Sequence, residues 1–136
     1  MQKYFFIKLN GKHVKINFFE ILYAEGCRNY IKIITESKAY LVLITMKRLE
    51  QILPAGMFTR IHKSFIVSLE KIIEFDPERV YIKGKELPIG QQYKGELEKA
   101  VLIASEATNE LTVASHFYPI PVVIKANQRN RLFEAG

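Results

Sequence analysis

Short runs of apolar and β-forming residues recur along the first 90 residues, and residues 13–16 also alternate between apolar and polar positions, as half-buried β-strands do. Asn10-Gly11 separates two such runs and predicts a tight hairpin, and residues 36–38 separate two more. A turn is also predicted at Asp76-Pro77. The pattern predicts strands at 3–9, 13–16, 18–25, 29–35, 39–44, 64–69, 71–75 and 79–84.

Apolar residues recur at helical spacing in only two places. Residues 45–54 lie between Thr45, a residue type that caps helix N-termini, and Pro54, which stops a helix. Residues 91–104 predict a closing helix. The expected fold is therefore mainly β, with short, mostly antiparallel strands and one or two short helices. Residues 1–104 are expected to form one domain, and residues 105–136 a C-terminal tail of unknown structure.

The composition is that of an ordinary globular domain, and 136 residues suffice for one core. The longest apolar run, residues 40–44, is far too short to cross a membrane. Cys27 is the single cysteine, so no internal disulfide can form, which fits a reducing compartment. The sequence predicts a cytoplasmic protein.

The net charge is +6, and the whole excess lies in residues 1–104. A basic balance of this kind favours polyanionic partners, mainly nucleic acid.

The residue types that perform catalysis are present but scattered. Cys27 and His62 lack the sequence context of a thiol enzyme, and a phosphate-binding glycine loop is absent. The three histidines have no clustered carboxylates or thiols around them. We therefore expect no enzyme activity, no metal and no cofactor.

Three polar loops lie at the ends of predicted elements, at residues 27–30, 60–64 and 90–94. Their side chains suit DNA, because Arg and Lys reach phosphates while Asn and Gln match the edge of adenine. Loops are also polar simply because they are solvated. For residues 60–64 two interpretations remain, an anion site beside a buried strand or an internal polar brace, the latter especially for His62.

The order of these motifs is specific. FEILYAEGCRNYIKIIT is followed by TMKRLEQILP, then FTRIHKSFIVSLEKI, then ELPIGQQYKGEL. Over about residues 5–103 the chain resembles the LytTR DNA-binding domain, the output module of many bacterial response regulators in two-component systems. The resemblance implies an elongated β fold that places loops in successive major grooves of double-stranded DNA.

Transferred by position, the resemblance implies base contacts from Asn29, Lys63 and Gln91. It implies phosphate contacts from Arg28, Arg60, His62, Ser64, Tyr93 and Lys94. The third loop departs from the family pattern P-x-S-R-x-Y, because Gln91 stands where the family has Arg. An Arg is the preferred partner of guanine, so this loop is expected either to prefer adenine or to contact DNA less.

The leading hypothesis is a sequence-specific transcription regulator, with a second copy on an adjacent repeat as a further partner. Family members commonly carry an N-terminal receiver domain, for which residues 1–4 leave no room. A stand-alone regulator and an excised domain are both compatible with this. The alternative function is a protein-interaction module that binds an acidic partner. Single-strand binding requires aromatic platforms, and Tyr30 and Tyr93 are the only aromatics in the loops.

Overall fold

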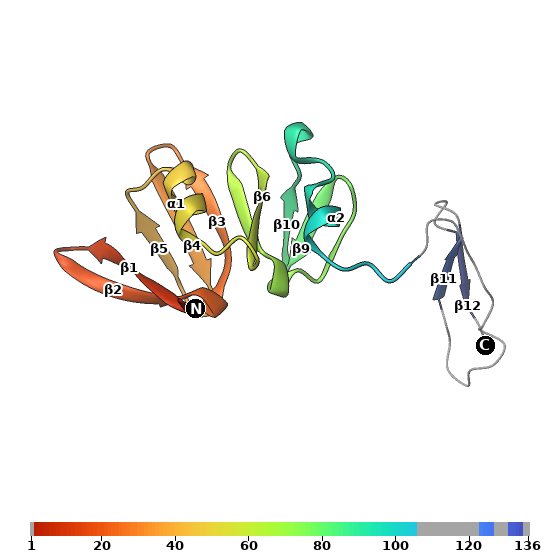
Figure 1. Cartoon of the computed structure of the whole chain (residues 1–136), viewed down its shortest axis with the longest axis horizontal. Helices are drawn as coiled ribbons and strands as arrows, with labels where there is room; N and C mark the ends of the chain where they lie inside the picture. The colour runs from red at the N-terminus through yellow and green to blue at the C-terminus, as the bar shows by residue number, and fades with distance from the viewer. Residues whose placement is uncertain (1, 106–122, 127–130, 135–136) are drawn as a thin grey trace. The chain divides into compact units, whose positions relative to one another are not determined.

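The computed structural model describes residues 2–105, 123–126 and 131–134. The chain divides into two compact units, Met1–Leu102 and Ile103–Gly136. The predicted fold class is confirmed, because short antiparallel strands dominate and the described helices are short (Figure 1). No helix in the described residues is both long enough and apolar enough to span a membrane.

The first unit contains three antiparallel sheets. The smallest pairs β1 (Tyr4–Leu9) with β2 (Lys12–Asn17). The largest has the order β5-β4-β3-β7-β6, and the third has the order β10-β9-β8. The strands of these two sheets are β3 (Ile21–Cys27), β4 (Tyr30–Thr35), β5 (Ala39–Val42), β6 (Phe58–His62), β7 (Phe65–Ser68), β8 (Glu74–Phe75), β9 (Arg79–Ile82) and β10 (Lys85–Pro88). The helices are α1 (Met46–Ile52), α2 (Glu96–Ala100) and the 3₁₀ turns η1 (Phe18–Glu20), η2 (Leu69–Lys71) and η3 (Gln91–Tyr93).

Local sequence chemistry explains where several elements begin and turn. Asn10 and Gly11 have φ of 51° and 78° and join β1 to β2, as expected of an Asn-Gly hairpin. The Thr45 hydroxyl accepts a hydrogen bond from the Arg48 N–H at 3.0 Å and caps α1. The predicted hairpin, cap and first helix are confirmed.

The five-stranded sheet is buried on both faces. On one face a cluster that includes Ile66 and Ile33 packs with Leu49 of α1 and with β1 and β2. On the other face Ile61 and Val67 pack with the three-stranded sheet and α2. A strand covered on both sides needs apolar residues at consecutive positions, which explains the uninterrupted run Phe65-Ile66-Val67. Full burial of each such side chain stabilises the fold by about 1.5–3 kcal/mol.

A bulge in β3 changes which residues face each core. The pairing of β3 with β4 shifts between Ile21 and Tyr23. Leu22 and Tyr23 consequently both belong to the second cluster, although they are adjacent in sequence.

The strand predictions were wrong in several places. Residues 18–20 form η1 before β3 begins, and of residues 71–75 only Glu74–Phe75 are strand. The list of predicted strands lacks β10, and the sequence pattern also missed β6. Its pairing with β7 is irregular between Arg60 and His62, so the period of two is broken within five residues.

The predicted closing helix at residues 91–104 was wrong in extent. Gly95 has φ of 89° and separates η3 from α2, because a left-handed residue cannot continue a right-handed helix. Leu97 is buried in the second core, whereas Leu102 is fully exposed beyond the helix end.

An ion cluster joins the two larger sheets at one end. The Glu36 carboxylate, after β4, accepts hydrogen bonds from Lys71 at 2.9 Å and Lys83 at 3.0 Å. Lys71 belongs to η2, and Lys83 lies in the turn between β9 and β10. The two ammonium groups lower the pKa of Glu36.

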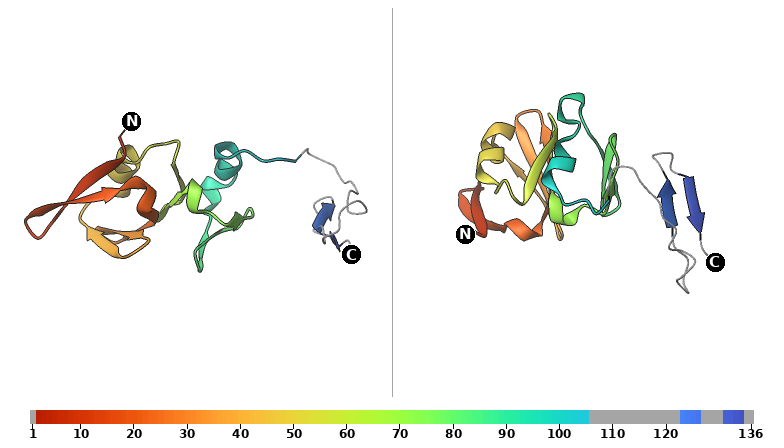
Figure 2. Two further views of the ribbon diagram at one scale, coloured as in Figure 1. Left: turned by 90° about the horizontal axis from the view of Figure 1, so that it is seen from below. Right: turned by 45° about the vertical axis from the view of Figure 1, so that its right-hand side comes forward.

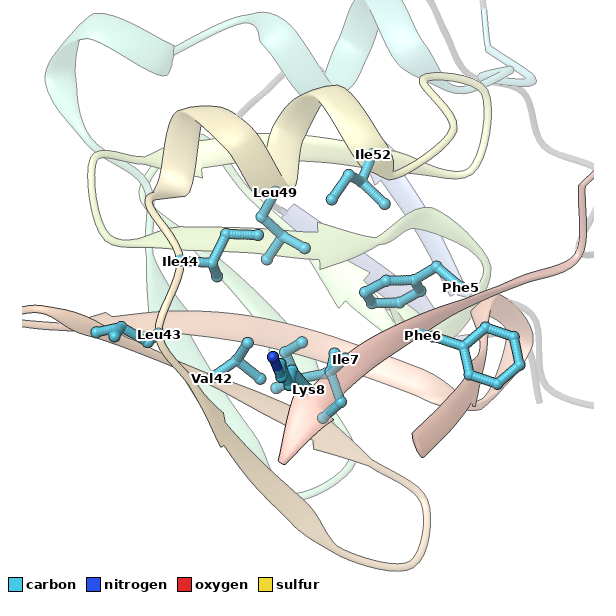
Figure 3. Close-up of a pocket in the computed structure, with 10 residues that line it drawn as sticks. Phe5, Phe6, Ile7, Lys8, Val42, Leu43, Ile44, Leu49 and Ile52 are labelled. Carbon is cyan, nitrogen blue, oxygen red and sulfur yellow. The ribbon is translucent and has the colours of Figure 1, made fainter. Parts of the chain in front are cut away.

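An apolar groove of about 390 Å³ lies beside α1 (Figure 3). β1 forms one wall, and the end of β5 with the segment that follows it forms another. Phe6 and Leu43 are both more than half exposed at this groove. The lining residues are Phe5, Phe6, Ile7, Lys8, Ile33, Val42, Leu43, Ile44, Leu49 and Ile52.

The second unit contains one antiparallel pair in its described residues. β11 (Val123–Ala126) pairs with β12 (Arg131–Glu134). The predicted domain boundary near residue 104 remains a prediction.

Candidate nucleic-acid interface

Three loops of the first unit lie at the same end of their strands. They are the β3–β4 turn, the β6–β7 turn and the segment that follows β10. In Figure 1 all three lie along the upper side of the unit, and the right-hand view of Figure 2 shows the same arrangement. These are the three polar loops that the sequence singled out, and the fold brings them together.

Backbone hydrogen bonds attach both outer loops to the central turn. The Gly26 N–H, near the end of β3, donates to the Ser64 carbonyl at 2.9 Å. The Gly90 N–H, after β10, donates to the Ile61 carbonyl at 2.7 Å. Main-chain hydrogen bonds therefore connect each outer loop directly to the central turn.

The first loop is a two-residue turn between Cys27 and Tyr30, which are paired across β3 and β4. Arg28 has φ of 58°, a left-handed conformation that non-glycine residues rarely adopt. The side chains of Arg28 and Asn29 are both exposed. Cys27 is half-buried, and its Sγ lies 3.9 Å from the Glu25 carbonyl.

The central turn presents Lys63 to solvent. Its neighbour His62 is half-buried, and the His62 Nδ1 accepts a hydrogen bond from the Ser64 N–H at 3.0 Å. This bond requires an unprotonated Nδ1 and leaves Nε2 as the donor of the neutral ring. The His62 and Phe65 rings lie 5.5 Å apart, so the ring braces the turn that the sequence placed beside a buried strand.

Arg60 also bonds inside the turn. Its Nη2 donates to the Lys63 carbonyl at 2.6 Å, and its Nε donates to the His62 carbonyl at 3.3 Å. Its Nη1 lies 3.1 Å from Glu50 of α1. The Arg60 side chain is 19% exposed, so most of its surface is covered by the protein.

The third loop begins at Gly90 and is supported from the β8–β9 turn. Gln91 is exposed, whereas Tyr93 and Lys94 are half-buried. The Lys94 ammonium lies 3.0 Å from the Glu78 carboxylate. Nearby, the Asp76 carboxylate accepts the backbone N–H groups of Glu78 and Arg79, and these bonds lower the pKa of Asp76.

Two glycines and one acid belong to this site and were missed in the sequence. A Cβ on Gly90 would lie 3.3 Å from the Tyr93 ring and 3.4 Å from the His62 ring, so Gly90 permits a close approach. A Cβ on Gly26 would lie 3.5 Å from Met46 and 3.8 Å from Ser64, which are ordinary contact distances. The Gly90 signal was available, because glycine replaces the serine of the family pattern. Glu50 gave no signal, since its partner Arg60 is ten residues away and on another element.

The described residues hold no cluster of three or more His, Cys, Asp or Glu side chains able to bind a metal. What the loops do offer is a row of donors on one side of the unit. Such a row suits the phosphates and base edges of a nucleic acid.

Comparison with known proteins agrees with this geometry. The family model of the LytTr DNA-binding domain matches residues 11–102. This range contains all three loops and both larger sheets.

The similar proteins are longer than this chain. The sensory transduction protein LytT of Bacillus subtilis (strain 168) is 30% identical over 90 residues, covering 62% of this chain and 37% of that protein. The LytT protein of Bacillus anthracis is 28% identical over 96 residues, covering 66% of this chain and 39% of that protein. The chain thus spans less than two-fifths of the length of these relatives.

A solved LytTr DNA-binding domain from Bacillus cereus has the same fold. It superposes with a TM-score of 0.65 at 21% sequence identity. The match covers 74% of this chain and 97% of that domain.

The bracing role of His62 predicts a stability effect. His62→Ala removes the acceptor of the Ser64 N–H, so we expect the free energy of unfolding to fall by about 1 kcal/mol. The melting temperature should fall by roughly 4–8 °C for a domain of this size. Lys63→Ala is the control, because this exposed side chain should leave the melting temperature unchanged. Equal melting temperatures for both variants would show that His62 does not brace the turn.

Proposed function

The chain belongs to the LytTr DNA-binding domain family, and on that premise we propose that it is a transcription regulator that binds double-stranded DNA sequence-specifically. Its three loops enter successive major grooves on one side of the duplex. The observation that carries this proposal is the pair of backbone bonds from Gly26 and Gly90 to the β6–β7 turn, which holds three exposed polar tips in one row.

One exposed residue of each loop is assigned to base reading. Asn29 and Gln91 carry amides, whose donor and acceptor match adenine in the major groove. Lys63 is a donor suited to guanine O6 and N7. All three side chains are exposed at the tips of their loops, so they are free to approach base edges.

Neighbouring donors are assigned to the phosphate backbone. Arg28 and Lys94 supply charge, and Ser64 and Tyr93 supply hydroxyl groups. His62 retains its Nε2–H for a phosphate while Nδ1 braces the turn. Arg60, which the sequence placed in the same set, has its guanidinium engaged inside the protein.

The domain organisation and biological setting belong to the same proposal. Residues 1–104 form the DNA-binding domain, and residues 105–136 lie outside it. The setting is a bacterial cytoplasm, with input from a two-component system and with a second copy bound on an adjacent DNA repeat. The relatives named LytT are described as sensory transduction proteins, which supports this setting.

The proposal is tested by binding to duplexes from a random library, before and after selection, across a salt series. Affinity should fall with salt with a slope of about −0.9 in log K against log[salt] for each phosphate neutralised. The selected duplex should bind roughly a thousandfold or more tightly than random duplex. Equal affinity for every duplex, or preference for an acidic protein over DNA, would favour the interaction-module alternative instead.

Lys63→Ala tests base reading in the central turn. If Lys63 reads a base, the variant should lose about 1–3 kcal/mol of binding free energy on the selected duplex and should relax the preference at one position. Lys85→Ala is the matched control, because Lys85 is exposed at the opposite end of β10 from the loops. A uniform loss on all duplexes, with unchanged selection, would reassign Lys63 to the phosphate backbone.

Gln91 tests the departure from the family pattern. Selection with the natural chain should return adenine at the base pair that Gln91 meets, and Gln91→Arg should shift this position toward guanine. Gln91→Ala should relax it. Gln92→Arg is the control, since it adds the same charge at the neighbouring exposed position and should raise affinity without changing the base. An unchanged base preference in both Gln91 variants would show that Gln91 does not contact a base.

A further inference from the structure

The side chain of Arg60 bonds to the backbone of the central β6–β7 turn. Its Nη2 and Nε bind the carbonyls of Lys63 and His62, the two residues that lead into the tip of the turn. A guanidinium bound to consecutive carbonyls holds them toward the protein. The Lys63 side chain, which is exposed, is thereby presented on the solvent side.

The same guanidinium is held by two other elements. Its Nη1 lies 3.1 Å from Glu50 of α1, and its central carbon lies 5.8 Å from the centre of the Tyr93 ring in η3. Arg60 therefore connects the central turn to α1 on one side and to the third loop on the other.

These contacts are unfavourable for a phosphate ligand. Three of the five N–H groups of Arg60 already have acceptors inside the protein. The Glu50 carboxylate, beside the guanidinium, would repel a phosphate that approached it. The Arg60 side chain as a whole is only 19% exposed, so it offers little surface to a duplex.

We propose that Arg60 is a positioning residue, held by Glu50, that sets the conformation in which Lys63 reads its base. This assignment rests on the proposed function, because it presumes that the β6–β7 turn enters a DNA groove. It replaces a direct phosphate contact for Arg60 and gives α1 a part in specificity through Glu50.

Arg60→Lys separates the two roles, because it keeps the charge and removes the fork of donors. For a positioning residue, affinity for the selected duplex should fall about tenfold, and the base preference at the Lys63 position should relax. Affinity for random duplex and the salt slope should stay unchanged. For a phosphate contact, lysine should preserve both the affinity and the base preference.

Glu50→Ala supplies a second test, because the change in charge and the loss of positioning are expected to alter DNA binding differently. Loss of an acid raises the affinity of a protein for all DNA, so charge alone predicts tighter binding. Loss of the Arg60 partner should instead lower the ratio of selected to random affinity by about twofold to fivefold, the range for an exposed ion pair. Glu70→Ala is the matched control, because Glu70 is exposed on η2 and its loss adds the same charge.

Amide hydrogen exchange of the free protein tests the effect of Arg60 on the turn without DNA. The Ser64 amide, bonded to His62, should exchange about tenfold faster in Arg60→Lys. If the natural chain fails to discriminate between duplexes, the proposed function fails. If it discriminates, and Arg60→Lys keeps both the slow Ser64 exchange and the base preference, the positioning role is overturned. An equal ratio of selected to random affinity in Glu50→Ala and Glu70→Ala would also contradict the positioning role of Arg60.

Discussion

The main-chain bonds on either side of the β6–β7 turn are the constraint on which the loop geometry depends. Gly26 and Gly90 donate to carbonyls only three residues apart, at Ser64 and Ile61. Both donors are glycines in close contact with the turn, Gly26 against Ser64 and Gly90 against His62. Three loops that are far apart in sequence thus share one short piece of backbone. A displacement of the central turn would move all three.

The rest of the fold keeps this turn in place. β6 and β7 belong to a sheet whose two faces are covered by separate apolar clusters, so the strands cannot tilt without exposing one of them. At the opposite end of the strands, Glu36 joins η2 to the β9–β10 turn. That ion cluster is exposed and contributes little stability. It connects the two larger sheets at the end that is far from the backbone bonds of the loops.

The sequence predicted the elements that depend on local chemistry. The Asn10-Gly11 hairpin and the Thr45 cap each depend on residues within one turn of chain, and both were found. β6 was missed because only two of its five residues, Phe58 and Ile61, are apolar, and each faces a different core. The closing helix was predicted too long, because apolar residues on both sides of Gly95 have helical spacing and this spacing does not reveal the left-handed conformation of Gly95.

The sequence indicated which residues lie in the candidate site, but it did not indicate the different roles of those residues. The motifs identified the residues of all three loops, because their polar types and spacing are written in the sequence. The difference between an exposed Lys63 and an internally bonded Arg60 arises from Glu50 and Tyr93, which approach Arg60 only in the folded chain. Residue type alone predicts that both basic side chains face a polyanion.

The bond from Gly90 to Ile61 has a consequence for the solubility of the sheet. β6 is an edge strand, and an edge with free carbonyls is a template for pairing with another chain. The Gly90 N–H occupies the Ile61 carbonyl, the bulge distorts the ladder beside it, and η3 and α2 both pack on β6. The contact that positions the third loop therefore also protects the edge of the sheet from unwanted strand pairing and aggregation.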